Sequence, residues 1–257
     1  MPLLADDEPA AFSLLHARSR SPFLLTADHA GRLIPKSLGT LGLGPEDLAR
    51  HIAWDIGIAQ VTKGLAAALG AAAVLQTYSR LVIDCNRSPE MPSAFPAVSE
   101  ETKIPGNAAL NEAEKLARQQ AIFDPYHKAI TQALDQRATQ APLYVAMHSF
   151  TPVYLQVQRP MHVAVLYHRS PRASKLLAGL LRHEPELVVA ENAPYQMSDA
   201  CDYSVPVHAE RRGLDYLEIE IRQDLIADAA GQGEWVARLA RLLPEVHKQL
   251  AQGAAQR

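Results

Sequence analysis

Three hydrophobic stretches of this sequence each lead into a cluster of polar side chains. They are residues 75–83 before Asp84-Cys-Asn-Arg87, residues 143–147 before His148-Ser149, and residues 217–222, where apolar residues alternate with Glu218, Glu220 and Arg222. Short apolar runs of this kind predict strands. Because ligands in open α/β sheets bind beyond the carboxyl ends of the strands, the three clusters can converge on one pocket.

Strands and helices are predicted to alternate along the chain. Apolar runs predict strands at 22–26, 73–83, 143–147, 163–167, 187–190 and 214–221, and helical spacing predicts helices at 46–69, 111–139, 172–183 and 234–252. This alternation favours an α/β fold in which a mostly parallel or mixed central sheet carries helices on both faces. With 257 residues, 48% of them hydrophobic, the chain can bury one large core, so we expect a single domain over residues 1–257.

Charge and cysteine content narrow the expected partners. The net charge is −3 and Lys and Arg are scattered, so we expect no nucleic-acid partner and no membrane partner. The absence of an eighteen-residue apolar run and of a secretory leader favours the cytoplasm. Cys85 and Cys201 lack the spacing of a zinc–thiolate site, so a metal would be held by His and carboxylate side chains. The expected partner is a small molecule.

Two His residues stand at the ends of predicted strands. His29 and His148 lie where a neutral imidazole could bind a divalent metal. Taken alone, such a His is more often a hydrogen-bonded loop residue than a metal ligand, and Glu220 could belong to a solvated edge strand with a Glu–Arg ladder. Together with an acid on the neighbouring predicted helix, where Asp55 shares a face with His51, the set matches a metal-assisted hydrolase in which a carboxylate removes a proton from water.

The pair Asn86-Arg87 could bind a substrate carboxylate. The guanidinium group offers a planar fork of two donors, and the amide adds a further donor. Signals for other enzyme classes are absent, since the sequence contains no GxGxxG after a strand, no GxxxxGK[ST], no GxSxG and no HExxH. Dinucleotide, phosphate-loop and serine-hydrolase chemistry are therefore not indicated.

Several blocks of the sequence resemble the successive motifs of the N-formylglutamate amidohydrolase family. The blocks are Leu25–Pro35, His51–Gly57, Tyr78–Arg87, Met147–Pro152 and Glu220–Leu225. That family is similar in turn to the zinc carboxypeptidases and to deacylases such as succinylglutamate desuccinylase and aspartoacylase. The resemblance implies a zinc-exopeptidase-like fold and hydrolysis of an N-acyl amino acid, above all N-formyl-L-glutamate, to the free amino acid and formate or the matching acid.

The resemblance also implies roles in binding a single Zn²⁺. His29 and His148 would be ligands that leave one position for water. Zinc carboxypeptidases take their second ligand from His-x-x-Glu, but Arg32 stands at that position here. We therefore expect Asp55 to be the third ligand, with Asp28 as the alternative.

The remaining candidates would act on the substrate. Glu220 would be the general base, Asn86 and Arg87 would hold the substrate carboxylate, and Arg80 would assist the carbonyl or a second carboxylate. Arg222 is a further substrate-binding candidate. Two other functions stay open at this point: a peptidase acting on short or cell-wall peptides, and a catalytically inactive protein that binds carboxylates.

Overall fold

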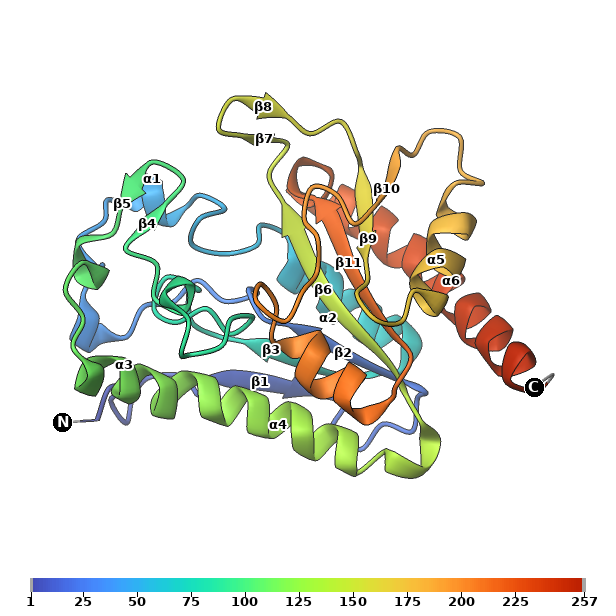
Figure 1. The fold of residues 1–257 in the computed structure, drawn as a ribbon, viewed down its shortest axis with the longest axis horizontal. Helices are drawn as coiled ribbons and strands as arrows, with labels where there is room; N and C mark the ends of the chain where they lie inside the picture. Colours follow the sequence, from blue (N-terminus) through green and yellow to red (C-terminus); the bar gives the residue numbers. More distant parts are fainter. Residues whose placement is uncertain (1, 256–257) are drawn as a thin grey trace.

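A mixed sheet of seven strands forms the centre of the molecule (Figure 1). The computed structural model describes residues 2–255. In spatial order the strands are β1 (Phe12–Leu15), β3 (Ala72–Gln76), β2 (Phe23–Ala27), β6 (Leu143–Phe150), β11 (Tyr216–Arg222), β9 (Val163–Leu166) and β10 (Val189–Glu191). The pairs β2–β3, β2–β6, β6–β11 and β9–β10 are parallel, and β1–β3 and β9–β11 are antiparallel. The expected α/β class with a mixed sheet is confirmed.

Helices cover both faces of this sheet, as the sequence predicts. The helices are α1 (Pro45–Leu48), α2 (Ile58–Leu69), α3 (Glu112–Arg118), α4 (Asp124–Asp135), α5 (Arg172–Leu181) and α6 (Ala229–Ala255). Helices α2, α5 and α6 share a core with one face, and α4, along the lower edge of Figure 1, packs on the other. In β2, Leu25 faces the first core and Leu24 the second, and both are fully buried. A strand covered on both faces therefore has a continuous apolar sequence.

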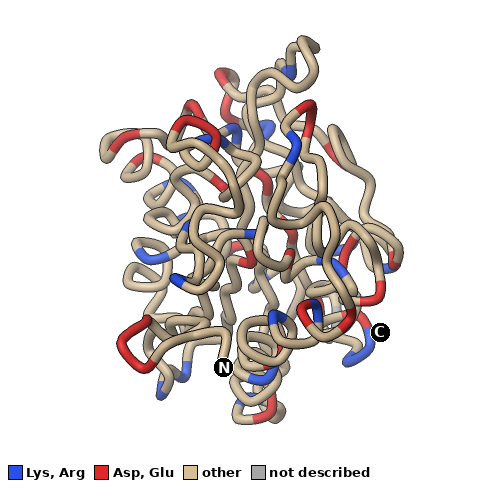
Figure 2. Tube along the Cα trace, turned by 90° about the vertical axis from the view of Figure 1, so that its left-hand side faces the viewer, with Lys and Arg blue, Asp and Glu red and all other residues tan. Residues whose placement is uncertain are grey.

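Two small hairpins lie outside the central sheet. β4 (Val98–Ser99) pairs with β5 (Thr102–Lys103), and β7 (Val153–Tyr154) pairs with β8 (Val157–Gln158) in the hairpin at the top of Figure 1. The sequence predicts neither, because two-residue strands are too short to show a period. No helix within residues 2–255 has the length and apolar character that crossing a membrane requires. Positive and negative residues are interspersed along the trace in Figure 2.

The prediction of one continuous helix over residues 46–69 is wrong in its middle part. Helices α1 and α2 are separate, and the residues between them form turns. Gly57, before α2, has φ +81°, and a Cβ there would lie 2.2 Å from a backbone carbonyl oxygen, so only glycine allows this close turn. Asp55 therefore does not share a helix face with His51. Its N–H instead donates to the carbonyl oxygen of His29 (2.9 Å).

The strand expected over residues 73–83 ends early, at Gln76. Beyond it the chain turns, and the Ser79 hydroxyl both donates to a backbone carbonyl and accepts from a backbone N–H. Residues 81–83 are completely buried. The apolar residues 81–83 therefore belong to a buried turn and not to a strand. Asp84–Arg87 follows this turn, so it does not stand at the end of a strand as predicted.

Two stacked imidazoles anchor this buried segment. Nδ1 of His127, on α4, lies 2.8 Å from Nε2 of His208, and Nε2 of His127 lies 2.9 Å from the carbonyl oxygen of Cys85. Because a carbonyl oxygen only accepts, His127 donates through Nε2 and accepts at Nδ1 from His208. Burial lowers the pKa of His127 to about 4 and that of His208 to about 3. Both imidazoles are therefore neutral near pH 7.

We expect the free energy of unfolding to fall by about 2 kcal/mol for each of these imidazoles between pH 7 and pH 5. In the unfolded chain each His binds a proton with a pKa of about 6.5. The folded chain excludes this proton, so the contribution of each neutral imidazole to stability is complete above that pH and is lost as the pH falls toward 4. Urea unfolding at several pH values measures the effect. A variant carrying both His127→Gln and His208→Gln should lose this pH dependence, and an unaltered dependence would contradict the assignment.

Candidate active site

His29, Asp55 and His148 meet in one buried cluster. His29 lies just after β2, Asp55 lies in the turn before α2, and His148 lies on β6. Nδ1 of His29 is 3.5 Å from one oxygen of Asp55, and Nδ1 of His148 is 3.2 Å from the other. Each residue is only 3% exposed. The structure thus brings together the three residues that the sequence predicts as metal ligands.

The cluster has the chemistry and spacing of a metal site. One nitrogen or oxygen from each of the three residues lies within 4.8 Å of the others. Tetrahedral ligands at about 2.1 Å from Zn²⁺ are roughly 3.4 Å apart, which fits both distances to Asp55. Within residues 2–255, Nδ1 of His29 is buried without a hydrogen-bond partner, a costly state that a bound ligand relieves. Two imidazoles and a carboxylate therefore fit a divalent metal.

Each imidazole also faces a second carboxylate on its other side. Nε2 of His29 lies 2.7 Å from one oxygen of Asp84, and the other oxygen accepts two hydrogen bonds from Arg80 (2.6 and 3.1 Å). Nε2 of His148 lies 3.6 Å from Asp28, whose other oxygen accepts from a buried tyrosine hydroxyl (2.5 Å). Carboxylates in this position fix the orientation and the tautomer of a metal-binding imidazole.

The geometry favours Asp55 over Asp28 as the third ligand. Asp28 faces Nε2 of His148, whereas Asp55 faces Nδ1 of both imidazoles. The N–H of Ser149 also donates to Asp55 (3.1 Å) and fixes its carboxylate. Burial opposes ionisation, but the two imidazoles outweigh it and hold the pKa of Asp55 below its usual value. Asp55 is therefore ionised, and its carboxylate can bind a metal cation placed between it and the two imidazoles.

Glu220 lies beside this cluster on the adjacent strand. The register of β11 and β6 pairs it with His148. It is 7% exposed, and one of its oxygens has no hydrogen-bond partner among residues 2–255. Burial, assisted by Asp55, raises the pKa of Glu220 to about 7. Because β11 is an interior strand, the solvated edge-strand alternative is wrong, and a carboxyl poised near neutrality is suited to accept a proton from water.

Asn86 and Arg87 differ in what they leave free for a ligand. The side-chain oxygen of Asn86 accepts from the N–H groups of Tyr203 and Ser204, and its amide donates to Asp202 (3.2 Å). Arg87 donates through Nη1 to the carbonyl oxygen of Asn86 (2.8 Å), and a quarter of its side chain is exposed. Asn86 thus anchors the segment of Tyr203, and Arg87 keeps donors for a substrate. Both substrate-binding roles stay predictions.

Arg80 and Arg222 differ in the same way. Arg80 binds Asp84 and lies 3.5 Å from Asp55, so its guanidinium borders the metal cluster. Arg222 donates to the carbonyl oxygens of residues 159–161 and to Asp224. Arg80 therefore reaches the site, whereas the donors of Arg222 are already used in hydrogen bonds to other groups of the protein. The substrate-binding role of Arg222 stays a prediction that this arrangement does not favour.

Sequence reasoning missed Arg159, which lies among aromatic rings that include Tyr195. Its guanidinium carbon is 4.7 Å from the ring centre of Tyr154 and 4.9 Å from that of Tyr195, and Nη1 donates to the Tyr195 hydroxyl (2.9 Å). Burial and the nearby Glu220 carboxylate raise the pKa of Tyr195. An arginine held in this way could bind a substrate carboxylate. The sequence around Arg159 signals only a loop, so no pattern links it to Glu220.

One protein family matches this chain over most of its length. A sequence model of the family described as N-formylglutamate amidohydrolase matches residues 21–227. The chain is 35% identical to gene product Atu2144 from Agrobacterium tumefaciens, with a TM-score of 0.92 over 97% of this chain and 99% of that chain. It shares its fold with N-formylglutamate amidohydrolase from Ralstonia eutropha JMP134, at 21% identity and a TM-score of 0.70, over 95% of this chain and 100% of that chain.

Among curated proteins, none matches the chain significantly. The family match spans most of the sequence and includes His29, Asp55, His148 and Glu220. It confirms the resemblance that the sequence blocks indicate. The chain therefore belongs to the N-formylglutamate amidohydrolase family.

Proposed function

We propose that this amidohydrolase is zinc-dependent and cleaves the amide bond of an N-acyl amino acid, with N-formyl-L-glutamate as the favoured substrate. The observation that carries the proposal is the buried cluster of His29, Asp55 and His148 with Glu220 on the next strand. Family membership supports the reaction class. We also propose that the whole chain is one domain, because its central sheet uses strands from β1 to β11. A reducing cytoplasm suits the free Cys85 and Cys201.

The metal-binding residues would be His29, Asp55 and His148, each through one atom. Bound there, Zn²⁺ would polarise the substrate carbonyl and lower the pKa of a water molecule. Asp84 holds the imidazole of His29 in the orientation that points Nδ1 at the cluster, and Asp28, 3.6 Å from Nε2 of His148, would do the same for the second imidazole. Arg80 neutralises Asp84 and so keeps its carboxylate ionised in a buried site.

Glu220 would move the proton during hydrolysis. Its free carboxylate oxygen accepts a proton from the attacking water. The same carboxyl then delivers that proton to the amine nitrogen as the amide C–N bond breaks, which releases the amino acid and formate. A carboxyl with a pKa of about 7 can perform both transfers near neutral pH.

A panel of substrates tests the proposed reaction. The chain, purified without chelators, is assayed for amine release from the N-formyl, N-acetyl and N-succinyl derivatives of glutamate and from a short peptide, and its metal content is measured. We expect near-stoichiometric zinc and the highest kcat/KM on N-formyl-L-glutamate. Preferred cleavage of the peptide would favour a peptidase, and a zinc-loaded chain that cleaves none of these compounds would support a carboxylate-binding protein.

Arg87→Lys is expected to raise KM by about 10- to 100-fold with a much smaller effect on kcat. A substrate carboxylate is charged in both the ground state and the transition state, so the lost guanidinium fork weakens both equally. The measurement compares the best substrate with its amide, in which the carboxylate is neutral. Arg222→Lys is the matched control, because the guanidinium of Arg222 already donates its hydrogen bonds to groups of the protein. Equal KM values for acid and amide would exclude Arg87 as the carboxylate-binding residue.

A further inference from the structure

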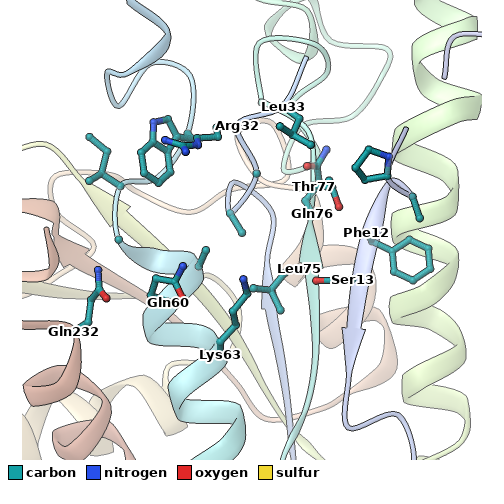
Figure 3. Close-up of a pocket in the computed structure, with 18 of the residues that line it drawn as sticks. Phe12, Ser13, Arg32, Leu33, Gln60, Lys63, Leu75, Gln76, Thr77 and Gln232 are labelled. Carbon is teal, nitrogen blue, oxygen red and sulfur yellow. The ribbon is translucent and has the colours of Figure 1, made fainter. Parts of the chain in front are cut away.

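A cavity that does not include His29, Asp55 or His148 lies between β1, β3 and α2. Its volume is about 620 Å³, within the range of sites for small molecules. Figure 3 shows side chains from these elements and from the loop of Arg32 around it. Leu75, Phe12 and Trp54 supply apolar wall, and Gln60 and Gln76 supply polar groups. Nothing in the proposed reaction uses this space.

The charged residues of this cavity are all positive. Arg32 and Lys63 are the only charged side chains that line it, and neither forms an ion pair within residues 2–255. Figure 3 shows Lys63 extending from α2 toward the loop of Arg32, whose guanidinium carbon lies 5.4 Å from the centre of the Trp54 ring. The guanidinium and ammonium groups of these two residues therefore remain available to an anionic ligand.

We propose that this cavity binds a small organic anion. Its carboxylate or phosphate would lie between Arg32 and Lys63, where charge-assisted hydrogen bonds are available. Its apolar body would pack against Trp54 and Phe12, whose partly exposed rings would then lose contact with water. A neutral molecule of the same shape would leave both cations unpaired and would bind far more weakly.

The cavity shares two wall segments with the candidate metal site. Residues 30–32 directly follow His29, and Trp54 directly precedes Asp55. The backbone at Gly31 is packed so closely that a Cβ there would lie 2.1 Å from a neighbouring backbone carbon. A ligand in the cavity would therefore contact the chain segments that carry His29 and Asp55. Binding of the anion does not depend on the proposed function.

Titration with phenylacetate, followed by tryptophan fluorescence and calorimetry, tests the binding without any turnover. Phenyl phosphate and the neutral phenylacetamide are titrated in parallel. We expect both anions to bind and the amide to bind at least about tenfold more weakly. A variant with Arg32→Gln and Lys63→Gln should lose about tenfold or more in affinity for the anions. Lys128→Gln, an exposed change on the opposite face of the sheet, should not.

Two outcomes would overturn the proposal. Equal affinity for phenylacetate and phenylacetamide would show that charge plays no part. Unchanged binding in the Arg32 and Lys63 variant, with loss of binding in Arg87→Gln, would place the anion in the candidate active site. Because all these measurements are made without substrate, they stand or fall independently of whether the chain hydrolyses N-formyl-L-glutamate.

Discussion

Glu220→Gln is expected to lower kcat on the best N-acyl amino acid by roughly 10²- to 10⁴-fold while zinc stays bound. Gln keeps the size of the side chain and can still form hydrogen bonds, but it cannot take up a proton. Glu220 is not one of the three residues that form the metal cluster, so its loss leaves the ligands intact. Steady-state kinetics together with metal analysis after dialysis measure both parts of the prediction.

Glu218→Gln is the matched control for this variant. Glu218 and Glu220 lie two residues apart on β11, both buried, so the two substitutions disturb the same strand in the same way. Burial raises the pKa of Glu218 well above its usual value, which favours the neutral carboxyl that an amide resembles. We expect kcat to change by no more than about threefold. Equal losses in the two variants would mean that the strand is disturbed, and Glu220 would not be the base.

His148→Ala is expected to abolish zinc retention and activity while unfolding stays cooperative. The substitution removes one of only three protein ligands, and the remaining pair cannot hold a metal against dialysis. The core on either side of β6 consists of apolar residues that the substitution does not touch. Metal content and urea unfolding of the same sample measure the two outcomes. Full zinc occupancy in this variant would contradict the ligand assignment.

Two aspartate variants test the rest of the cluster. Asp28→Asn removes a group that orients His148, which costs about 10- to 100-fold in metal affinity at a typical site. Asp55→Asn removes a direct ligand and should cost more. Both variants preserve the volume of the side chain. If Asp28→Asn were the more damaging of the two, Asp28 and not Asp55 would be the third ligand.

The order of strands and helices could be predicted from the sequence because the central strands are apolar along their whole length. The same signal misplaced the end of β3, since residues 81–83 are equally apolar but form a buried turn. Helical spacing likewise joined α1 to α2, because it cannot show that Gly57 turns the chain between them. Patterns of hydrophobicity report burial, and hydrogen bonding decides which buried segments become strands.

The candidate ligands could be predicted because His29 and His148 are close to strand ends. Their supporting partners could not. Asp84 lies 55 positions from His29 in the sequence, yet their side chains are 2.7 Å apart. Arg159 lies 36 positions from Tyr195, yet it donates a hydrogen bond to the Tyr195 hydroxyl, and Asn86 is tied to the backbone of Tyr203. Contacts between distant segments depend on the complete fold, and the spacing of residues does not encode them.

The dispersal of the candidate ligands along the chain has a consequence for biosynthesis. Asp55 and His148 are 93 positions apart, so a growing polypeptide exposes His29 and Asp55 well before β6 has been made. A nascent chain that ends before β6 lacks His148, one of the three proposed zinc ligands. The proposed site requires the loops between these residues to close before the metal can bind, so we expect metal loading to be a late event in maturation. Ribosome-bound fragments should therefore neither sequester zinc nor acquire hydrolytic activity before β6 and β11 have been added to the sheet.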